Sequence, residues 1–431
     1  MIKLIFKNLQ AHRRRYFWIL LELIIVSITA WLLLDPAIIT ISSLSIPTGY
    51  DKECLVKISL AEEPAITDNN GQTSEDSESA DIQRILSRLS ADNRVEASTL
   101  VDNLVFESGG MTMNTFNVDK EPNDFYHMGI DIPGIEFFST FGIIDVATGK
   151  APTVKPGSTN DIYISESIAD YLFPGENAVG HYIEERYKNY KTGGNNRHII
   201  GVVNDALYRT GYARTPLIYS YRPEEFSDAE YVSIVLRLKP GVDVEDYIKD
   251  ITPALTREMK SGKIYPHSPK SYRDEAKRNS GNLDKMVFIT LAIATFFFIN
   301  MFLAITGTFY LQTRRRSEDA GIMRTFGATP RRIVFEMIGE GIILVTTACA
   351  IGFSAYWFIA RHYGNLADVS VSDKSMAVKE IMPLWWDNFN THFFTVSAII
   401  YILLITIVAI GIYIPARRIS RVNPVDALKD E

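Results

Sequence analysis

The sequence predicts an integral membrane protein with four transmembrane α-helices, arranged one plus three, and a large extracytoplasmic α+β domain inserted between the first and second. Hydrophobic residues gather in four blocks, at 16–34, 286–311, 341–360 and 393–414. Each block is close to the ~20 apolar residues that a helix needs to cross a bilayer. The polar interval between the first two blocks is long enough to bury a core of its own.

These observations divide the chain into eight parts. An interfacial segment and the first transmembrane helix occupy 1–34, and the extracytoplasmic domain occupies 35–285. The second helix lies at 286–311, the cytoplasmic loop with a short helix at 312–332, and the third helix at 333–360. An extracytoplasmic loop at 361–392, the fourth helix at 393–414 and a cytoplasmic tail at 415–431 complete the chain.

Positive charges beside the blocks predict the orientation, since cytoplasmic loops carry an excess of Lys and Arg. The N-terminal segment holds five such residues, the 312–332 loop six and the tail four, whereas the 361–392 loop holds three alongside four acids. We therefore expect a multi-pass protein of the cell inner membrane with both termini in the cytoplasm.

The N-terminal region carries a basic stretch before its apolar block, as a cleaved signal peptide does. The block is longer than the apolar part of a signal peptide and "WLLLDPAII" has no small-residue cleavage site, so we expect a membrane anchor. Residues 1–12 place apolar side chains on one helical face, which fits either an interfacial helix or an extension of the first span.

Overall charge and cysteine content say little about function. The net charge of −7 combines basic residues near the membrane with acids of the inserted domain, and the clustered arginines suit anionic lipid rather than nucleic acid. Cys54 and Cys349 are assigned to different compartments, so no intramolecular disulfide is expected.

Strand-like and helix-like runs alternate along the inserted domain, which indicates an α+β domain that could be divided into two lobes. Strands are expected at 53–60, 95–106, 161–165, 181–187, 197–203, 217–222 and 231–238, and helices at 81–90, 166–173 and 244–259. The acidic stretch 62–80 is expected to be a mobile loop in part, and it has no fixed ligand spacing for a metal. Residues 262–285 lead back to the membrane.

No enzymatic motif is found. The stretch "GIIDVATGK" at 142–150 has the wrong glycine spacing for a phosphate-binding loop, and Ala151 stands where Ser or Thr would bind magnesium. The seven histidines show no zinc spacing, and no GxSxG elbow is present. We therefore expect no catalytic, cofactor-binding or metal-binding residues.

The predicted spans carry few polar residues, which does not suit a channel or secondary transporter. Glu22 is the exception, about two turns into the first span. It could pair with a cation on a neighbouring subunit or extend to the cytoplasmic face.

The cytoplasmic stretch "RRRSEDAGIMRTFGATPRRI" at 314–333 predicts a short independent helix. Ser317 suits the N-cap, and Glu318 and Asp319 follow in the first turn, where the helix dipole favours acids. Arg324 lies near the other end and Gly327 is a stop signal. Thr329 and Pro330 then cap and start the next helix.

An apolar group projects from this short helix. Ile322 and Phe326 are four residues apart on one face, and Met323 lies beside them. Because a two-turn helix is marginal in water, it needs a surface to dock against. The headgroup layer and a cytoplasmic protein are both possible surfaces.

Three stretches carry a resemblance to known proteins. They are "EDAGIMRTFGAT" at 318–329, "PARRISRVNPVDAL" at 415–428 and, in the inserted domain, "YISESIADYLFPGENAVG" at 163–180 followed by "IIGVVND". All three resemble the MacB and FtsX family of ABC-transporter permeases. The first is similar to the family's cytoplasmic pattern E-I-G-x-x-R-A-x-G-A-T, and the second is similar to its C-terminal ending. With the one-plus-three arrangement, the resemblance covers nearly the whole chain.

The resemblance implies that the short helix is a coupling helix, which docks into a cleft of a separate ATPase subunit. Gly321, Ile322, Arg324, Gly327, Ala328 and Thr329 match the pattern. Asp319 replaces Glu, Ala320 replaces Ile, Thr325 replaces Ala, and Asp426 replaces Glu in the tail. The shorter Asp keeps the charge and Ala320 removes apolar contact, so the docking strength is open. The expected ATPase-coupling residues are Glu318, Asp319, Gly321, Ile322, Met323, Arg324, Phe326 and Gly327.

The implied function is that of a permease subunit without ATPase activity of its own. It would work as a dimer, with itself or a related chain, bound to two ABC ATPase subunits that hold the ATP. It would export or extract peptide, antibiotic or lipoprotein substrates, with a periplasmic adaptor as a further partner. The alternative is mechanotransmission without transport, regulating a cell-wall hydrolase or a sensor-kinase pathway. A membrane-anchored binding protein would need no coupling helix.

Overall fold

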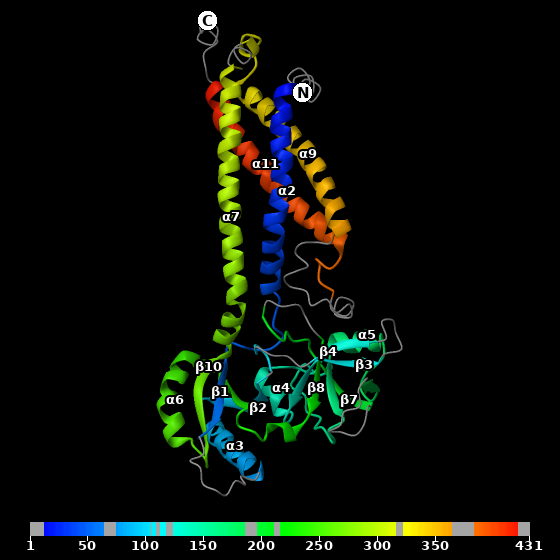
Figure 1. Ribbon diagram of the computed structural model, residues 1–431, viewed down its shortest axis with the longest axis vertical. Helices are drawn as coiled ribbons and strands as arrows, with labels where there is room; N and C mark the ends of the chain where they lie inside the picture. The colour runs from blue at the N-terminus through cyan, green and yellow to red at the C-terminus, as the bar shows by residue number, and fades with distance from the viewer. Residues whose placement is uncertain are drawn as a thin grey trace. The chain divides into compact units, whose positions relative to one another are not determined.

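The computed structural model describes residues 13–63, 75–103, 105–108, 113–117, 124–185, 196–210, 216–315, 322–363 and 383–420. The chain forms two compact units. The membrane unit contains four long helices, and the inserted domain comprises Ser43–Leu283. Figure 1 shows the elements of each.

The four predicted membrane helices are present among the described residues, and each is long and apolar enough to cross a bilayer. They are α2 (Arg13–Leu44), α7 (Tyr272–Arg315), α9 (Pro330–Tyr363) and α11 (Phe389–Ile419). All four extend past their apolar blocks, and α2 continues through Pro36. Hydropathy marks only the part of a helix that contacts hydrocarbon, whereas backbone hydrogen bonding carries the helix further.

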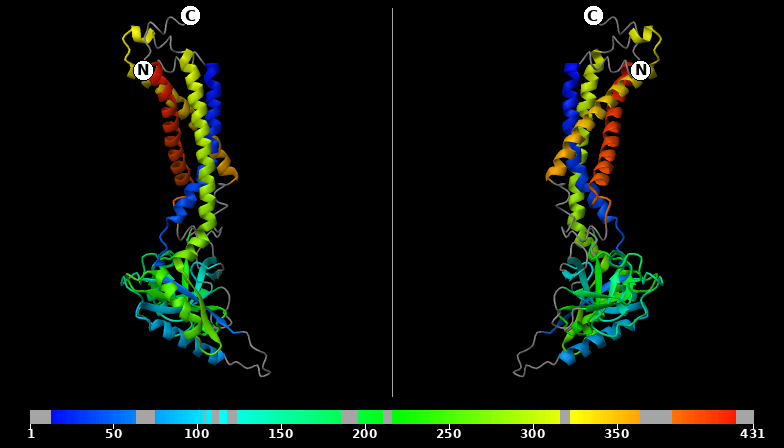
Figure 2. Two further views of the ribbon diagram at one scale, coloured as in Figure 1. Left: turned by 90° about the vertical axis from the view of Figure 1, so that its left-hand side faces the viewer. Right: turned by 90° about the vertical axis from the view of Figure 1, so that its right-hand side faces the viewer.

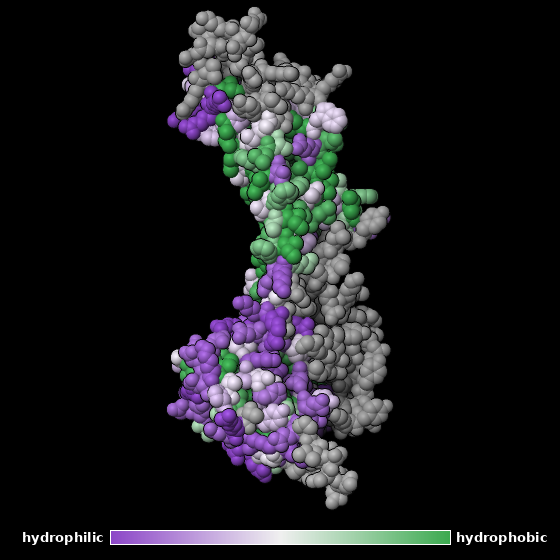
Figure 3. All heavy atoms as spheres, turned by 60° about the vertical axis from the view of Figure 1, so that its left-hand side comes forward, coloured by the Kyte–Doolittle hydropathy of each residue, from purple (hydrophilic) through white to green (hydrophobic). Residues whose placement is uncertain are grey.

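Helices α2, α9 and α11 share one apolar core. Its fully buried members include Trp31 of α2, Val345 of α9 and Ile400 of α11. Glycines allow close approach: a Cβ on Gly341 of α9 would lie 2.1 Å from the Ile412 side chain of α11. Figure 2 shows these helices from two further sides, and Figure 3 shows hydrophobic side chains gathered on the surface of the membrane unit.

The inserted domain has two lobes, as predicted. The sheet lobe is a four-stranded antiparallel sheet in the order β10-β1-β9-β2. Its strands are β1 (Leu55–Glu62), β2 (Val95–Asp102), β9 (Val232–Leu238) and β10 (Ile264–Ser271). Apolar faces of α3 (Glu75–Ser90) and α6 (Val244–Glu258) pack on it through residues such as Ile85 and Ile251.

The barrel lobe is a closed barrel in the order β3-β4-β8-β5-β7-β6. Its strands are β3 (Met113–Asn117), β4 (Asp124–Ile132), β5 (Asp161–Ser165), β6 (Tyr182–Glu185), β7 (Asn196–Val203) and β8 (Leu217–Tyr221). Two short helices belong to this lobe, α4 (Glu136–Phe141) and α5 (Glu166–Leu172), and a 3₁₀ turn (Pro223–Phe226) follows β8. The strands and helices predicted in both lobes are therefore confirmed, apart from shifts at their ends.

Several elements lie where the sequence analysis assigned none. Strand β10 and the first turns of α7 occupy 264–285, and β3, β4 and α4 lie between 113 and 141. Strand β10 contains Pro266 and Pro269, which argue against a strand when only the sequence is considered. Proline has no backbone N–H to donate to a neighbouring strand. This is tolerated here because β10 lies at the edge of the sheet, next to β1.

An aromatic junction joins the two lobes to the chain segments that connect with the membrane helices. It consists of Tyr50, Phe106, Phe137, Phe141 and Tyr272, all buried in one cluster. The ring of Phe141 lies 6.0 Å from that of Tyr50 and 5.6 Å from that of Tyr272, both edge to face. Side chains from both lobes pack around this junction, so the lobes share it.

The connector that follows α2 is held tightly against the barrel lobe. The backbone N–H of Leu207 donates to the Thr48 carbonyl at 2.7 Å, and the Asn204 side-chain amide donates to the Gly49 carbonyl at 2.7 Å. Gly49 has φ +76°, and a Cβ there would lie 1.9 Å from the Asp205 carbonyl oxygen. This position therefore requires glycine for both its backbone conformation and its contact.

We expect Gly49→Ala to destabilise the inserted domain by more than the ~1–2 kcal/mol that a left-handed backbone costs a residue with a side chain. The additional loss comes from the collision with Asp205. Calorimetric unfolding of the detergent-purified protein measures it. Gly149→Ala is the matched control, because Gly149 has φ +67° with nothing within 4 Å of the added Cβ. Equal losses in the two variants would contradict the close approach.

Candidate coupling segment

The structure describes part of the predicted coupling region. Glu318, Asp319 and Gly321 lie outside the described residues, and so does the expected N-cap, Ser317. Ile322, Met323, Arg324, Phe326 and Gly327 are described, within the stretch that we call segment 322–330. This segment is one helical turn, residues 322–325, followed by a tight bend into α9.

The bend is a Schellman motif, which ends a helix by satisfying its last carbonyls. The Ala328 N–H donates to the Met323 carbonyl at 2.9 Å, and the Gly327 N–H donates to the Arg324 carbonyl at 3.0 Å. Gly327 has φ +87°, the left-handed conformation that the motif needs. The predicted stop at Gly327 is therefore confirmed.

The start of α9 follows at once. Thr329 is its N-cap: the Thr329 hydroxyl accepts from the Arg332 N–H at 3.4 Å, and the Thr329 carbonyl accepts from the same N–H at 3.0 Å. Pro330 occupies the first helical position, where its missing N–H costs nothing. The predicted cap at Thr329 and start at Pro330 are confirmed. The end of the turn at 322–325 is therefore followed directly by the start of α9.

The apolar side chains of segment 322–330 point two ways. Phe326 is 88% exposed and Ile322 is 46% exposed. Met323, by contrast, packs with Ala328 against the core of the membrane helices. The exposed apolar surface is therefore formed by Ile322 and Phe326 without Met323, which instead anchors the segment to the membrane unit.

Three helical turns along α9, a buried carboxylate meets a second helix. Glu340 is buried and its Oε2 accepts a hydrogen bond from the Tyr16 hydroxyl of α2 at 3.0 Å. A charged or polar group inside a bilayer is costly unless it is paired within the protein. This contact therefore holds α2 against the helix that begins at segment 322–330.

A second buried polar cluster joins α2 to α11. His392 Nε2 lies 2.5 Å from Asp35 Oδ1, with both side chains 2% exposed. One turn away, the Trp31 indole N–H donates to the Ser397 hydroxyl at 3.1 Å. The Trp31 ring stacks on Tyr356 of α9 at 4.5 Å and on Phe393 of α11 at 5.4 Å.

These contacts are not predicted from the sequence, because one apolar block ends before Asp35 and another begins after His392. The sequence therefore assigns Asp35 to the inserted domain and His392 to the 361–392 loop, whereas both lie inside helices. The available signal was an aspartate and a histidine that flank two apolar blocks. Glu22 lies on an exposed face of α2, and it forms no ion pair with a described residue, which leaves both alternatives for it open.

Two family models match the chain. The model for the FtsX-like permease C-terminal domain matches residues 291–424, and that for the MacB-like periplasmic core domain matches residues 52–254. Together they cover the inserted domain up to α6 and most of the last three membrane helices. No significant match was found among curated proteins.

Solved structures that are similar to the chain include the periplasmic region of MacB from Actinobacillus actinomycetemcomitans. It is 14% identical, with a TM-score of 0.31, covering 54% of this chain and 95% of that one. A domain of a putative permease from Porphyromonas gingivalis is 14% identical, with a TM-score of 0.32 and coverages of 53% and 93%. The extracellular domain of the noncanonic ABC-type transporter YknZ from Gram-positive bacteria is 13% identical, with a TM-score of 0.29 and coverages of 49% and 100%.

We expect Gly327→Ala to loosen segment 322–330 without disturbing α9. Nothing lies within 4 Å of the added Cβ, so the change costs only the ~1–2 kcal/mol of a left-handed backbone. Hydrogen exchange at the Gly327 and Ala328 amides should accelerate roughly 5- to 30-fold, the factor that such an energy represents. Exchange in the middle of α9 should not change. Unaltered exchange at both bend amides would contradict the Schellman geometry.

Proposed function

Because the chain belongs to the MacB/FtsX family of ABC-transporter permeases, we propose that segment 322–330 is its coupling element. In this proposal a separate ATPase subunit binds the segment from the cytoplasm and moves it as ATP is bound and hydrolysed. The membrane helices transmit that motion to the inserted domain on the outer side. The chain is then the permease subunit of an ABC transporter and hydrolyses no ATP itself.

One observation carries the proposal: two large apolar side chains are exposed on a base of fixed geometry. Burying a side chain of the size of Ile or Phe is worth about 1.5–3 kcal/mol each. Ile322 and Phe326 together therefore provide a substantial driving force for docking. Met323 and the capped start of α9 hold the base, so a force applied to the two side chains reaches α9.

The membrane unit supports transmission rather than conduction. Among the described residues, the buried polar side chains Tyr16 and Glu340 contact each other, and so do Asp35 and His392. Ser27 likewise donates to the Ile24 carbonyl of its own helix. Polar groups used in this way stabilise a bundle and do not line an aqueous path.

The remaining parts of the complex follow from the family. We propose a dimer of permeases with two ATPase subunits, in the inner membrane, with both termini cytoplasmic. The substrate class is peptide, antibiotic or lipoprotein, handled on the outer side of the membrane for export or extraction, together with a periplasmic adaptor.

The docking proposal is tested with Ile322→Asp plus Phe326→Asp. Both side chains are exposed, so the variant should fold, but two carboxylates in an apolar cleft carry a large desolvation penalty. We expect at least a tenfold fall in the amount of ABC ATPase that co-purifies with the tagged protein from crosslinked membranes. Mass spectrometry identifies the ATPase by its phosphate-binding loop.

The matched control is Ile144→Asp plus Val146→Asp. These residues are also apolar and exposed, at 42% and 41%, but belong to the inserted domain. The control should retain the wild-type amount of ATPase. Full recovery of the ATPase with the Ile322 and Phe326 variant would show that docking occurs elsewhere.

A further inference from the structure

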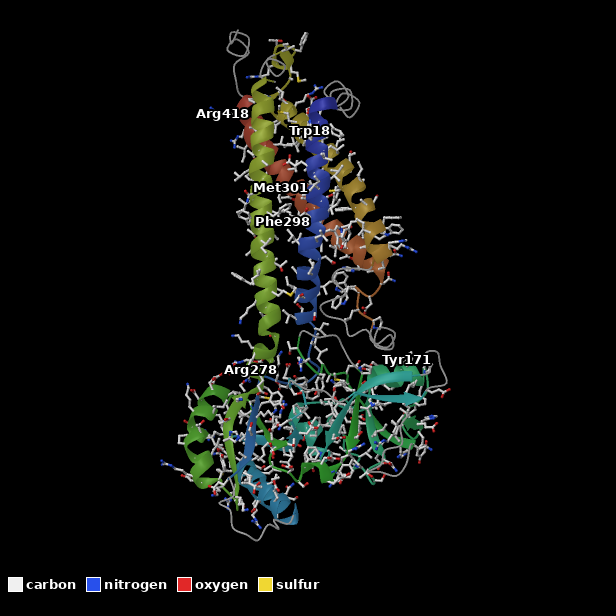
Figure 4. The ribbon with its side chains drawn as sticks, viewed as in Figure 1. Trp18, Tyr171, Arg278, Phe298, Met301 and Arg418 are labelled. Atoms are coloured by element: carbon white, nitrogen blue, oxygen red, sulfur yellow. The ribbon has the colours of Figure 1, made fainter. Side chains whose placement is uncertain are left out.

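Two helices lead from the membrane unit into the inserted domain, and they differ in how firmly they are attached to α9. In the most apolar stretch of each helix, 39% of the residues of α2 are buried, compared with 33% in α9, 33% in α11 and only 11% in α7. Figure 4 labels Phe298 and Met301 on the membrane part of α7. Met301 is one of the few described α7 residues buried in the shared core.

Helix α2 is fixed to α9 and α11 by specific contacts along its length. Tyr16 bonds to Glu340 near its start, and Asp35 contacts His392 three-quarters of the way along. Between them, Ser27 fits against Gly352 of α9, where an added Cβ would lie 2.0 Å from the Ser27 hydroxyl oxygen. By comparison, the polar Asn300 of α7 bonds to the Phe296 carbonyl of its own helix.

The two helices also lead to different lobes. After α2, the connector is bound to the barrel lobe through Thr48 and Gly49. Helix α7 continues directly from β10 of the sheet lobe, and Arg273 in its first turn pairs with Glu245 of α6 at 2.9 Å. A shift of α2 relative to α7 would therefore move the barrel lobe relative to the sheet lobe.

We propose that α2 is the helix that carries the motion of segment 322–330 out of the membrane, and that the Tyr16–Glu340 and Asp35–His392 contacts are the latches that bind α2 to α9 and α11. This inference rests on the proposed function. When the segment moves α9, the latches make α2 move with it, while α7 remains with the sheet lobe. The displacement then reaches the barrel lobe at the hydrogen bonds between the connector and residues 204–207.

The latches are Tyr16, Asp35, Glu340 and His392, and all four are positioning residues. Each is buried inside the protein, where a hydrogen bond is electrostatically stronger than in water. Their geometry also suits transmission of force in either direction, since a hydrogen bond between two helices resists sliding along the helix axes.

The test is hydrogen exchange of the intact permease–ATPase complex in lipid nanodiscs, with no nucleotide and with ATP plus vanadate. The informative amides are Asp51, which donates to the Phe141 carbonyl at 2.9 Å, and Leu207, which donates to the Thr48 carbonyl. In wild type, we expect nucleotide to change exchange at both amides. In Tyr16→Phe plus His392→Leu, that change should be lost, although the ATPase still binds and turns over ATP.

The control is Met301→Ala, which removes a buried contact of α7 and leaves both latches intact. It should keep the nucleotide-dependent change. The inference is overturned if the latch variant keeps the wild-type change, or if Met301→Ala abolishes it. A wild-type complex without any nucleotide-dependent exchange in the inserted domain would instead contradict the proposed function itself.

A disulfide between α2 and α9 shows whether the latch variant has lost only the connection between these helices or has a damaged structure. With Cys54 and Cys349 replaced by Ala, Ser27→Cys plus Gly352→Cys places a disulfide between α2 and α9. The Ser27 Cβ and the Cβ built on Gly352 are 3.3 Å apart, close to the ~3.5–4.5 Å of a disulfide. Oxidation should restore the nucleotide-dependent change to the latch variant, and reduction should remove it again. Failure of the oxidised form to restore it counts against the latches.

Should the double latch variant not fold, Tyr16→Phe and Asp35→Asn are tested singly, because each removes or neutralises one group with little change of shape. Each single substitution is expected to at least halve the nucleotide-dependent change in hydrogen exchange at the Asp51 and Leu207 amides. If both variants show the same change in exchange as wild type, the inference is overturned.

Discussion

Polar groups within a bilayer must find their partners in the protein, and the organisation of the membrane unit follows from this constraint. Glu340 and Asp35 would each be costly if they faced hydrocarbon. Each is paired with a side chain from another helix, Glu340 with Tyr16 and Asp35 with His392. An apolar helix surface gains no hydrophobic stabilisation when it leaves lipid for another helix, because lipid tails are equally apolar. Hydrogen bonds between helices therefore help to determine which helices stay together.

In segment 322–330, one bend provides hydrogen-bond partners for the end of one helix and for the start of the next. The Schellman bonds at Gly327 and Ala328 close the short turn, and the Thr329 cap opens α9 immediately afterwards. No unstructured residue separates the two, so the bend has few internal degrees of freedom. The turn that carries Ile322 and Phe326 is thus joined directly to the first turn of α9.

The sequence predicts the structure best where a local rule decides it. Gly327, Thr329 and Pro330 were predicted correctly because stop and cap signals depend only on neighbouring residues. The apolar blocks predicted four membrane helices for the same reason, and alternating runs predicted most strands of the two lobes. In contrast, β10 was missed because its two prolines are tolerated only at a sheet edge, and an edge is a property of the assembled sheet.

The contacts between helices could not be predicted for a related reason. Asp35 and His392 are 357 residues apart, and only the packed bundle brings them together. In the sequence each is a polar residue at the end of an apolar block, where a span normally stops. Met323 shows the same limit on a smaller scale: periodicity places it near Ile322 and Phe326, but packing turns it towards the core.

The inserted domain is joined to the membrane helices in a way that suits discrete movement. Close-packed protein interiors do not deform continuously, so a lobe that is displaced moves as a body about the contacts it shares with its neighbour. Here the shared contacts are the edge-to-face rings of the aromatic junction, in which Phe141 touches both Tyr50 and Tyr272. Tyr50 lies in the connector from α2, and Tyr272 is the first residue of α7. The two chain segments that enter the domain therefore meet at the place where its lobes meet, and a small change in their separation bears directly on the angle between the lobes.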